Sequence, residues 1–156
     1  MAQAVGGAPS KAEIERFERA FTMCQLGDPQ VFIELMLKIE TDGSDGMTRL
    51  VPMLFSNEPN QQFYHKRLFD RATWEGLHPG QTFMPWVVDA LTLKDRKARW
   101  TSYWTAILFA KMVCIPGTHV LCITDSEDTF LPVNKFLNGY FTNMPQWARP
   151  VLKAAR

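Results

Sequence analysis

Apolar residues recur at helical spacing near the start of the chain. One helical stripe is formed by Ile14, Phe17, Phe21 and Cys24, because residues three or four positions apart share a helix face. Ser10 stands where an N-cap belongs, and Glu13 follows it at the spacing of a capping box. Gly27 is typical of a helix end. The pattern predicts a helix after residue 10, and residues 1–10 are expected to be disordered.

Shorter runs with different patterns follow that helix. Asp28 and Pro29 indicate the start of a second helix, and the run QVFIELMLKIE after them is apolar enough to be mostly buried. A turn-rich TDGSDG loop leads to TRLVPMLF. Pro52 interrupts this run and cannot donate to a ladder, so we expect an edge strand or an irregular lead-in. The run SNEPNQQFYHKRLFDRATWEG predicts a further helix, with Pro59 in its first turn.

The second half of the chain alternates between strand-like and helix-like runs. WVVDALTL (residues 86–93) and HVLCIT (residues 119–124) are short, apolar and bounded by turn signals, so each predicts a buried strand. TSYWTAILFAKMVC between them predicts an apolar helix, and residues 125–141 predict another, weakened by Pro132. Such alternation favours an α/β fold with a parallel sheet and flanking helices, preceded by the N-terminal helices.

Composition is consistent with one globular domain, which we expect to cover residues 11–156. Of the 156 residues, 46% are hydrophobic and 21% charged, close to globular averages. The net charge of +1 excludes a strongly basic protein, so any contact with nucleic acid would depend on local charge. The clearest local excess lies in residues 94–111. Its cations are Lys94, Arg96, Lys97, Arg99 and Lys111, and its only acid is Asp95.

Cysteine and histidine spacing indicates neither a metal site nor a disulfide framework. The three cysteines, Cys24, Cys114 and Cys122, are far apart and set among apolar residues. The three histidines, His65, His78 and His119, are scattered, and we expect surface or strand positions for them. The start of the chain does not have the pattern of a signal peptide, and no run approaches the roughly 20 apolar residues of a membrane span. We therefore expect a soluble, intracellular protein.

The basic run 94–99 lies just before the N-terminus of the predicted helix, which is a favourable position for binding an anion. A helix N-terminus carries about half a positive charge and free N–H groups, so it favours phosphate. Lys97 and Arg99 would add cations, and hydroxyl groups follow at Thr101, Ser102 and Thr105. The run has no glycine and so does not match the Walker A pattern GxxxxGK[ST]. A solvated basic turn is the alternative interpretation, and packing is the simpler role for the neighbouring aromatic residues than stacking on bases.

Taken in order, the chain resembles the N-terminal ATPase region of the large terminase subunit of tailed phages, over roughly residues 28–152. That family often has a degenerate Walker A motif, K-x-R-x-x-G-x-[ST]. KARWTSYWT is similar to it, with Lys97 and Arg99 matching, Ser102 in the glycine position, and Trp104 or Thr105 in the hydroxyl position. Upstream, NEPNQQ resembles the helix start whose glutamine reads adenine, and either Gln61 or Gln62 matches that glutamine. Downstream, IPGTHVLCITD and NMPQWARP resemble the next strand and a following loop.

The resemblance implies a P-loop NTPase-like sheet and a DNA-packaging motor that binds ATP and Mg²⁺. Arg99 would be the catalytic residue, and Thr105 or Ser102 would reach the metal. The implied ATP-binding residues are Gln61, Gln62, Lys97, Arg99, Trp100, Thr101, Ser102, Tyr103, Trp104 and Thr105. The implied partners are double-stranded phage DNA, the portal protein and the small terminase subunit, in the host cytoplasm.

The chain also departs from that family. It has no glycine in the motif, Tyr103 stands where many P-loops have lysine, and no Asp-Glu Walker B pair or nuclease region is recognisable. HVLCITD could be mistaken for a Walker B strand, but an ordinary strand end with Asp125 or Ser126 capping the next helix is the better explanation. We therefore expect a terminase fragment with little or no hydrolysis of its own. The alternative is a catalytically silent phage interaction module that binds the portal, the small terminase subunit or DNA.

Overall fold

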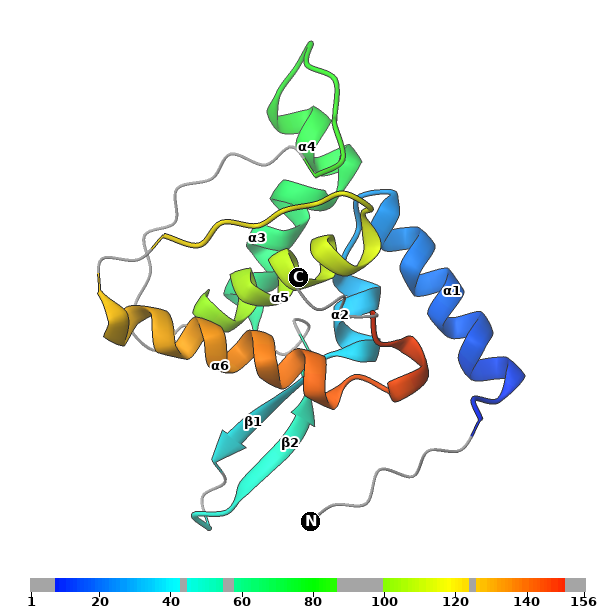
Figure 1. The fold of residues 1–156 in the computed structure, drawn as a ribbon. Helices are drawn as coiled ribbons and strands as arrows, with labels where there is room; N and C mark the ends of the chain where they lie inside the picture. The colour runs from blue at the N-terminus through cyan, green and yellow to red at the C-terminus, as the bar shows by residue number, and fades with distance from the viewer. Residues whose placement is uncertain (1–7, 43–44, 55–57, 87–99, 124–125, 151–156) are drawn as a thin grey trace.

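The computed structural model describes residues 8–42, 45–54, 58–86, 100–123 and 126–150. In this part of the chain the fold is mixed α/β, with helices arranged around a small core and one two-stranded sheet (Figure 1). The helices are α1 (Lys11–Gln25), α2 (Gln30–Met36), α3 (Pro59–Phe69), α4 (Arg71–Leu77), α5 (Trp100–Cys114) and α6 (Glu127–Asn143). The strands are β1 (Lys38–Asp42) and β2 (Thr48–Pro52), and a 3-10 helix follows at Gln146–Ala148.

The first helix forms as its sequence pattern predicts. Glu13 N donates to Ser10 Oγ at 3.3 Å, and Ser10 N donates to a Glu13 carboxylate oxygen at 2.9 Å, so the capping box is present. After the helix, Gly27 has a φ of +107°, which L-residues with a Cβ rarely adopt. A Cβ at that position would also lie 2.8 Å from the Cβ atom of Pro85. Glycine is therefore required there both by the backbone angle and by a close contact.

The sheet is an antiparallel hairpin that projects from the helices below α6 (Figure 1). Ile39 lies opposite Val51 in its register. The second helix is shorter than predicted, because Lys38, Ile39 and Glu40 belong to β1. A loop as short as the one between the two strands can join only antiparallel neighbours, since a parallel pair needs a crossover. The edge-strand prediction around Pro52 is confirmed, and the parallel sheet is not found among the described residues.

The single helix predicted for residues 56–76 is two helices. Pro59 lies in the first turn of α3, as expected. Asp70 breaks the helical path, with φ −83° and ψ +113°, and its carboxylate accepts a hydrogen bond from Thr73 N at 2.8 Å. An aspartate that caps the next helix can interrupt a continuous run because its side chain satisfies free N–H groups.

The two long C-terminal helices form as predicted, including α6, which continues through Pro132. The strand predicted for HVLCIT is wrong: residues 118–123 join no ladder in the described structure, and the side chains of Leu121 and Ile123 are 82% and 85% exposed. A strand needs a partner for its backbone groups. The other predicted strand, residues 86–93, lies outside the described residues from position 87 onward.

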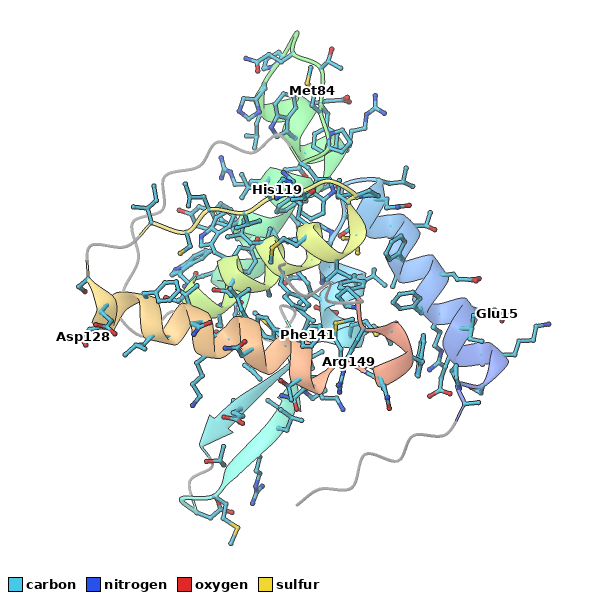
Figure 2. All side chains as sticks on the ribbon, in the orientation of Figure 1. Glu15, Met84, His119, Asp128, Phe141 and Arg149 are labelled. Carbon is cyan, nitrogen blue, oxygen red and sulfur yellow. The ribbon has the colours of Figure 1, made fainter. Side chains whose placement is uncertain are left out.

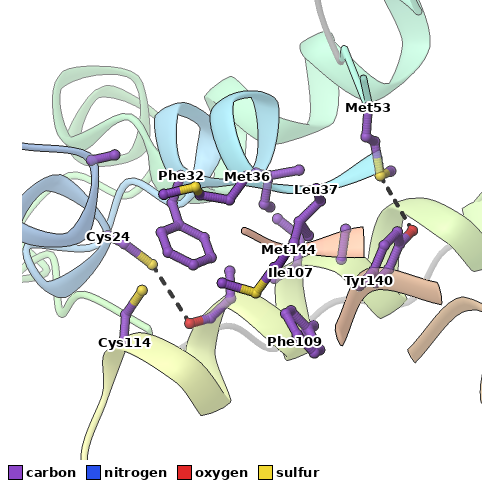
Figure 3. Packing of buried hydrophobic residues seen from close by; sticks show 14 of the residues in the cluster. Cys24, Phe32, Met36, Leu37, Met53, Ile107, Phe109, Cys114, Tyr140 and Met144 are labelled. Atoms are coloured by element: carbon purple, nitrogen blue, oxygen red, sulfur yellow. Dashed lines mark hydrogen bonds between the residues drawn. The ribbon is translucent and has the colours of Figure 1, made fainter. Parts of the chain in front are cut away.

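The core is formed mainly between α1, α2, α5 and α6 (Figure 3). The Cys24 thiol donates to the carbonyl oxygen of Ala110, at a distance of 3.8 Å, which joins α1 to α5. Its hydrogen bond with Cys114 and its burial raise the pKa of Cys24. Tyr140 Oη donates to Ser102 O at 2.9 Å and lies 3.3 Å from Met53 Sδ. Among the described residues, none of the helices combines the length and the apolar character that crossing a membrane requires.

Candidate nucleotide site

Most residues assigned to ATP from the sequence lie in the first two turns of α5. Trp100, Ser102, Tyr103 and Thr105 are buried, and Thr101 and Trp104 are partly buried. Lys97 and Arg99 lie outside the described residues. α5 is apolar on most of its circumference, and such a helix is expected to be enclosed by its neighbours.

The aromatic residues at the start of α5 pack against one another and against α3. The Trp100 ring lies 4.8 Å from the Tyr64 ring and 5.5 Å from the Tyr103 ring, edge to face in both cases. Edge-to-face contacts at such distances are favourable ring arrangements. The interpretation of these aromatic residues as packing residues is therefore confirmed for Trp100 and Tyr103.

The Thr105 hydroxyl group is used within α5. Its Oγ1 atom donates to the carbonyl oxygen of Thr101 at 2.6 Å, one helical turn earlier. This is a common hydrogen bond of threonine within helices. In this conformation the group proposed to reach a metal is directed along its own helix and is buried. The described residues also contain no cluster of three or more His, Cys, Asp or Glu side chains that could hold a metal ion.

A cavity of about 290 Å³ lies where β2, α3 and α5 meet. It is lined by Ile39, Val51, Pro52, Met53, Leu54, Glu58, Gln61 and Ser102. Gln61 and Ser102 are 3% and 5% exposed, so both belong to the interior. These two residues, far apart in the sequence, were both assigned to ATP, and they line the same cavity. Gln62, the alternative for the adenine contact, is partly buried and does not line it.

The lining combines apolar walls with a few hydrogen-bonding groups. The Gln61 side-chain amide and the Ser102 hydroxyl group can each donate and accept hydrogen bonds. The Glu58 carboxylate can accept them. Polar and apolar groups contribute about equally to its surface, and its volume is near the lower limit for small-molecule pockets.

A buried polar cluster, missed in the sequence, lies beside this cavity. His65 is 4% exposed, and the expectation of a surface or strand position for it is wrong. Its Nδ1 atom lies 3.2 Å from Tyr103 Oη, and its Nε2 atom lies 3.5 Å from Asp28 Oδ1. His65 follows Gln61 by one helical turn and precedes Phe69 by another, and all three are buried. The spacing of Gln61, His65 and Phe69 on one face of α3 is the sequence signal that could have indicated that His65 is buried.

The electrostatics of the cluster follow from burial and hydrogen bonding. Burial raises the pKa of Asp28, but the hydrogen bonds from His65 and from Gln30 N outweigh it, and the resulting pKa is below the usual aspartate value. Burial raises the pKa of the Tyr103 phenol. Asp28 is therefore ionised at neutral pH, and Tyr103 keeps its proton.

A second, larger cavity of about 780 Å³ is lined by residues of β1 and α6. One of its lining residues is Asp128, at the start of α6 (Figure 2). Phe136 and Tyr140 contribute apolar surface to it. Lys135 Nζ lies 3.5 Å from a Glu40 carboxylate oxygen across it. None of its lining residues was predicted to bind a ligand.

No family model, curated protein or solved structure matches the chain.

Proposed function

We propose that the chain is the nucleotide-binding segment of a DNA-packaging motor, similar to the N-terminal ATPase region of tailed-phage large terminases. The segment would bind ATP and Mg²⁺ and would hydrolyse ATP slowly or not at all by itself. Its partners in the complete motor would be double-stranded phage DNA, the portal protein and the small terminase subunit.

The observation that carries this proposal is the shared cavity of Gln61 and Ser102. The resemblance matches either Gln61 or Gln62 to the glutamine that reads adenine, and it matches Ser102 to the glycine position of the phosphate loop. Their common position at one cavity is what a nucleotide site needs, because base and phosphate contacts must come from converging elements. The same geometry favours Gln61 over Gln62 as the residue that reads the base.

The start of α5 supports the phosphate part of the proposal. α5 begins at Trp100, directly after the basic run that contains Lys97 and Arg99. The positive end of the α5 dipole and these two cations would stabilise negative charge together. Positioned charge is the main requirement of phosphoryl transfer. In this proposal Arg99 and Lys97 contact phosphate, and Thr105 reaches Mg²⁺ after leaving its hydrogen bond to Thr101.

Thermal unfolding with and without Mg–ATP tests the proposal. A ligand at a hundredfold excess over its Kd stabilises the folded chain by about 2.7 kcal/mol. We expect such a shift in the wild-type chain and its loss in Arg99→Ala. Arg96→Ala is the matched control, because it removes the same charge from the same run but lies outside the motif. Gln61→Ala should also lose the shift, relative to its own ligand-free melting point, whereas Gln62→Ala should keep it.

The competing function is that of a catalytically silent interaction module for the portal, the small terminase subunit or DNA. The exposed apolar segment 118–123 favours it, because contiguous exposed apolar residues often mark a protein interface. No stabilisation of the wild-type chain at millimolar Mg–ATP would reject the nucleotide site and favour this function.

A further inference from the structure

Residues 118–123, between α5 and α6, form an exposed apolar segment. Leu121 and Ile123 are 82% and 85% exposed, the highest values among the large apolar side chains of the described residues. The segment belongs to no helix or ladder in the described part of the chain, and it crosses the surface as an extended trace (Figure 1). Its backbone groups can therefore pair with a strand of another molecule, and its alternate side chains can enter an apolar cavity beside that strand.

The larger cavity has features that complement this segment. Its walls are mostly apolar, with Ile39 from β1 and Leu131 and Phe136 from α6. Among the described residues its lining includes residues of β1 but none of β2, so it lies along the side of β1 that faces away from β2. β1 pairs with β2 alone in the described structure, so its outer edge can accept a further strand (Figure 1). A strand edge beside an apolar cavity is the arrangement that binds an extended chain by strand addition.

Charge complementarity gives the added strand a direction. Three acids follow the segment in the run DSED (residues 125–128). In the cavity, Lys135 is paired with Glu40, so the charge at the start of β1 comes from Lys38, which is exposed and lines the cavity. A strand that runs antiparallel to β1 ends beside Lys38, the first residue of β1. The acids after the segment would then lie near this lysine, whereas a parallel strand would carry them away from it.

We propose that residues 118–123 of one copy of the chain add to β1 of a second copy as an antiparallel strand, with Leu121 and Ile123 in the larger cavity. In this orientation the exposed His119 comes beside Asp42 at the end of β1, whose carboxylate can accept a hydrogen bond from the ring. Within one copy α6 lies between the segment and β1, so the strand comes from another molecule (Figure 1). The contact joins two different surfaces, so each copy can give one strand and receive another. It does not depend on the proposed nucleotide function.

Two variants each disable one side of the contact. Leu121→Asp puts a charge on the side chain that would enter the cavity, at a position that is exposed in a single copy. Gly139→Glu puts a charge into the cavity itself, because Gly139 lines it and a Cβ there would meet no heavy atom within 4 Å. The matched controls are Met84→Asp, at another exposed apolar residue, and Gly76→Glu, at a glycine of α4 with equally open surroundings.

Sedimentation equilibrium of the full chain measures self-association. A reductant is present throughout, because it excludes a disulfide between copies through the exposed Cys122. We expect the wild type and both controls to associate as their concentration rises. Leu121→Asp and Gly139→Glu should each weaken this association about tenfold or more, because a charge buried in an apolar site is costly. A wild-type chain that stays monomeric, or an association that either variant leaves unchanged, overturns the proposal.

A mixture of the two variants tests whether the segment and the cavity bind each other. Leu121→Asp keeps an intact cavity and Gly139→Glu keeps an intact segment, so the mixture should form a 1:1 complex although neither variant associates alone. Absence of that complex would contradict the proposal.

A peptide of residues 117–125 replaces Leu121→Asp if that variant does not fold. The peptide should bind Gly76→Glu, whose cavity is unchanged, and should bind Gly139→Glu about tenfold more weakly or not at all. Equal binding to the two chains, or binding to neither, would reject the cavity as the site of the added strand.

Discussion

Helices α1 and α5 have the same length of 15 residues but depend on different parts of the molecule. In α1 only Ala20 and Cys24 are buried, and its first turn is closed by the capping box of Ser10 and Glu13. In α5 nine residues are buried, including the polar Ser102 and Thr105. Local sequence therefore explains α1, whereas the environment of α5 comes from α1, α2 and α6, which surround it.

The comparison teaches how the candidate site acquires its polar groups. Polar residues on α1 face solvent, where they contribute to solubility and to the cap. Ser102 and Thr105 on α5 are buried, where an unsatisfied polar group costs about 1 to 3 kcal/mol. Thr105 finds its partner within α5, and other groups of this helix find partners on neighbouring helices. Tyr140 on α6 and His65 on α3 are two such partners, bonded to Ser102 O and to Tyr103. The cavity that Gln61 and Ser102 share therefore depends on tertiary packing.

The largest effect should come from truncating α5 in the core. Phe109→Ala removes a buried ring that lies 5.8 Å from the ring of Tyr140, and it should lower the free energy of unfolding by about 3 to 5 kcal/mol. Ile14→Ala on the partly exposed face of α1 should cost about 1 kcal/mol or less. Urea unfolding of both variants measures the difference. Equal losses would contradict the contrast between the two helices.

A medium effect is expected from the contact between α6 and α5. Tyr140→Phe removes the hydroxyl group that donates to Ser102 O and should cost about 1 to 2 kcal/mol. Tyr64→Phe, at a partly buried tyrosine of α3, is the matched control and should change stability less.

Tyr140→Phe should also change how the free energy of unfolding depends on pH. Burial raises the pKa of the Tyr140 phenol above its unfolded value of about 10. Its contribution to stability is therefore complete below that pH and is lost as the pH rises, because the unfolded chain releases the proton first. Above pH 10 the wild-type chain should lose stability more steeply than Tyr140→Phe in denaturant titrations. Parallel curves would show that Tyr140 is not protected from ionisation.

The smallest effect concerns the local cap of α1. Ser10→Ala removes the hydroxyl oxygen that accepts from Glu13 N and should cost about 1 kcal/mol. Ser10→Thr keeps a hydroxyl group and should be close to the wild type. Circular dichroism during thermal unfolding measures both, and equal destabilisation by the two substitutions would argue against the capping box as the cause.

Part of the candidate site was predictable from sequence. Gln61 and Ser102 were selected through the resemblance to large terminases, and the α5 boundary followed from its apolar run. The contact of His65 with Tyr103 was not predictable, because a single amino-acid sequence does not indicate that α3 and α5 pack against each other at these residues. Nor did the sequence indicate that Gln61, rather than Gln62, would line the cavity, since both lie in the first turns of the same helix.

By itself, the sequence determined the elements whose stability is local. The capping box of α1, the helix start at Pro59 and the apolar run of α5 depend on neighbouring residues along the chain, whose interactions need no distant partner. Tertiary structure alone decided which helices bury which polar groups and whether an apolar run such as residues 118–123 finds a strand to pair with. Burial and pairing require surfaces from remote segments, and the position of those surfaces is a property of the whole fold.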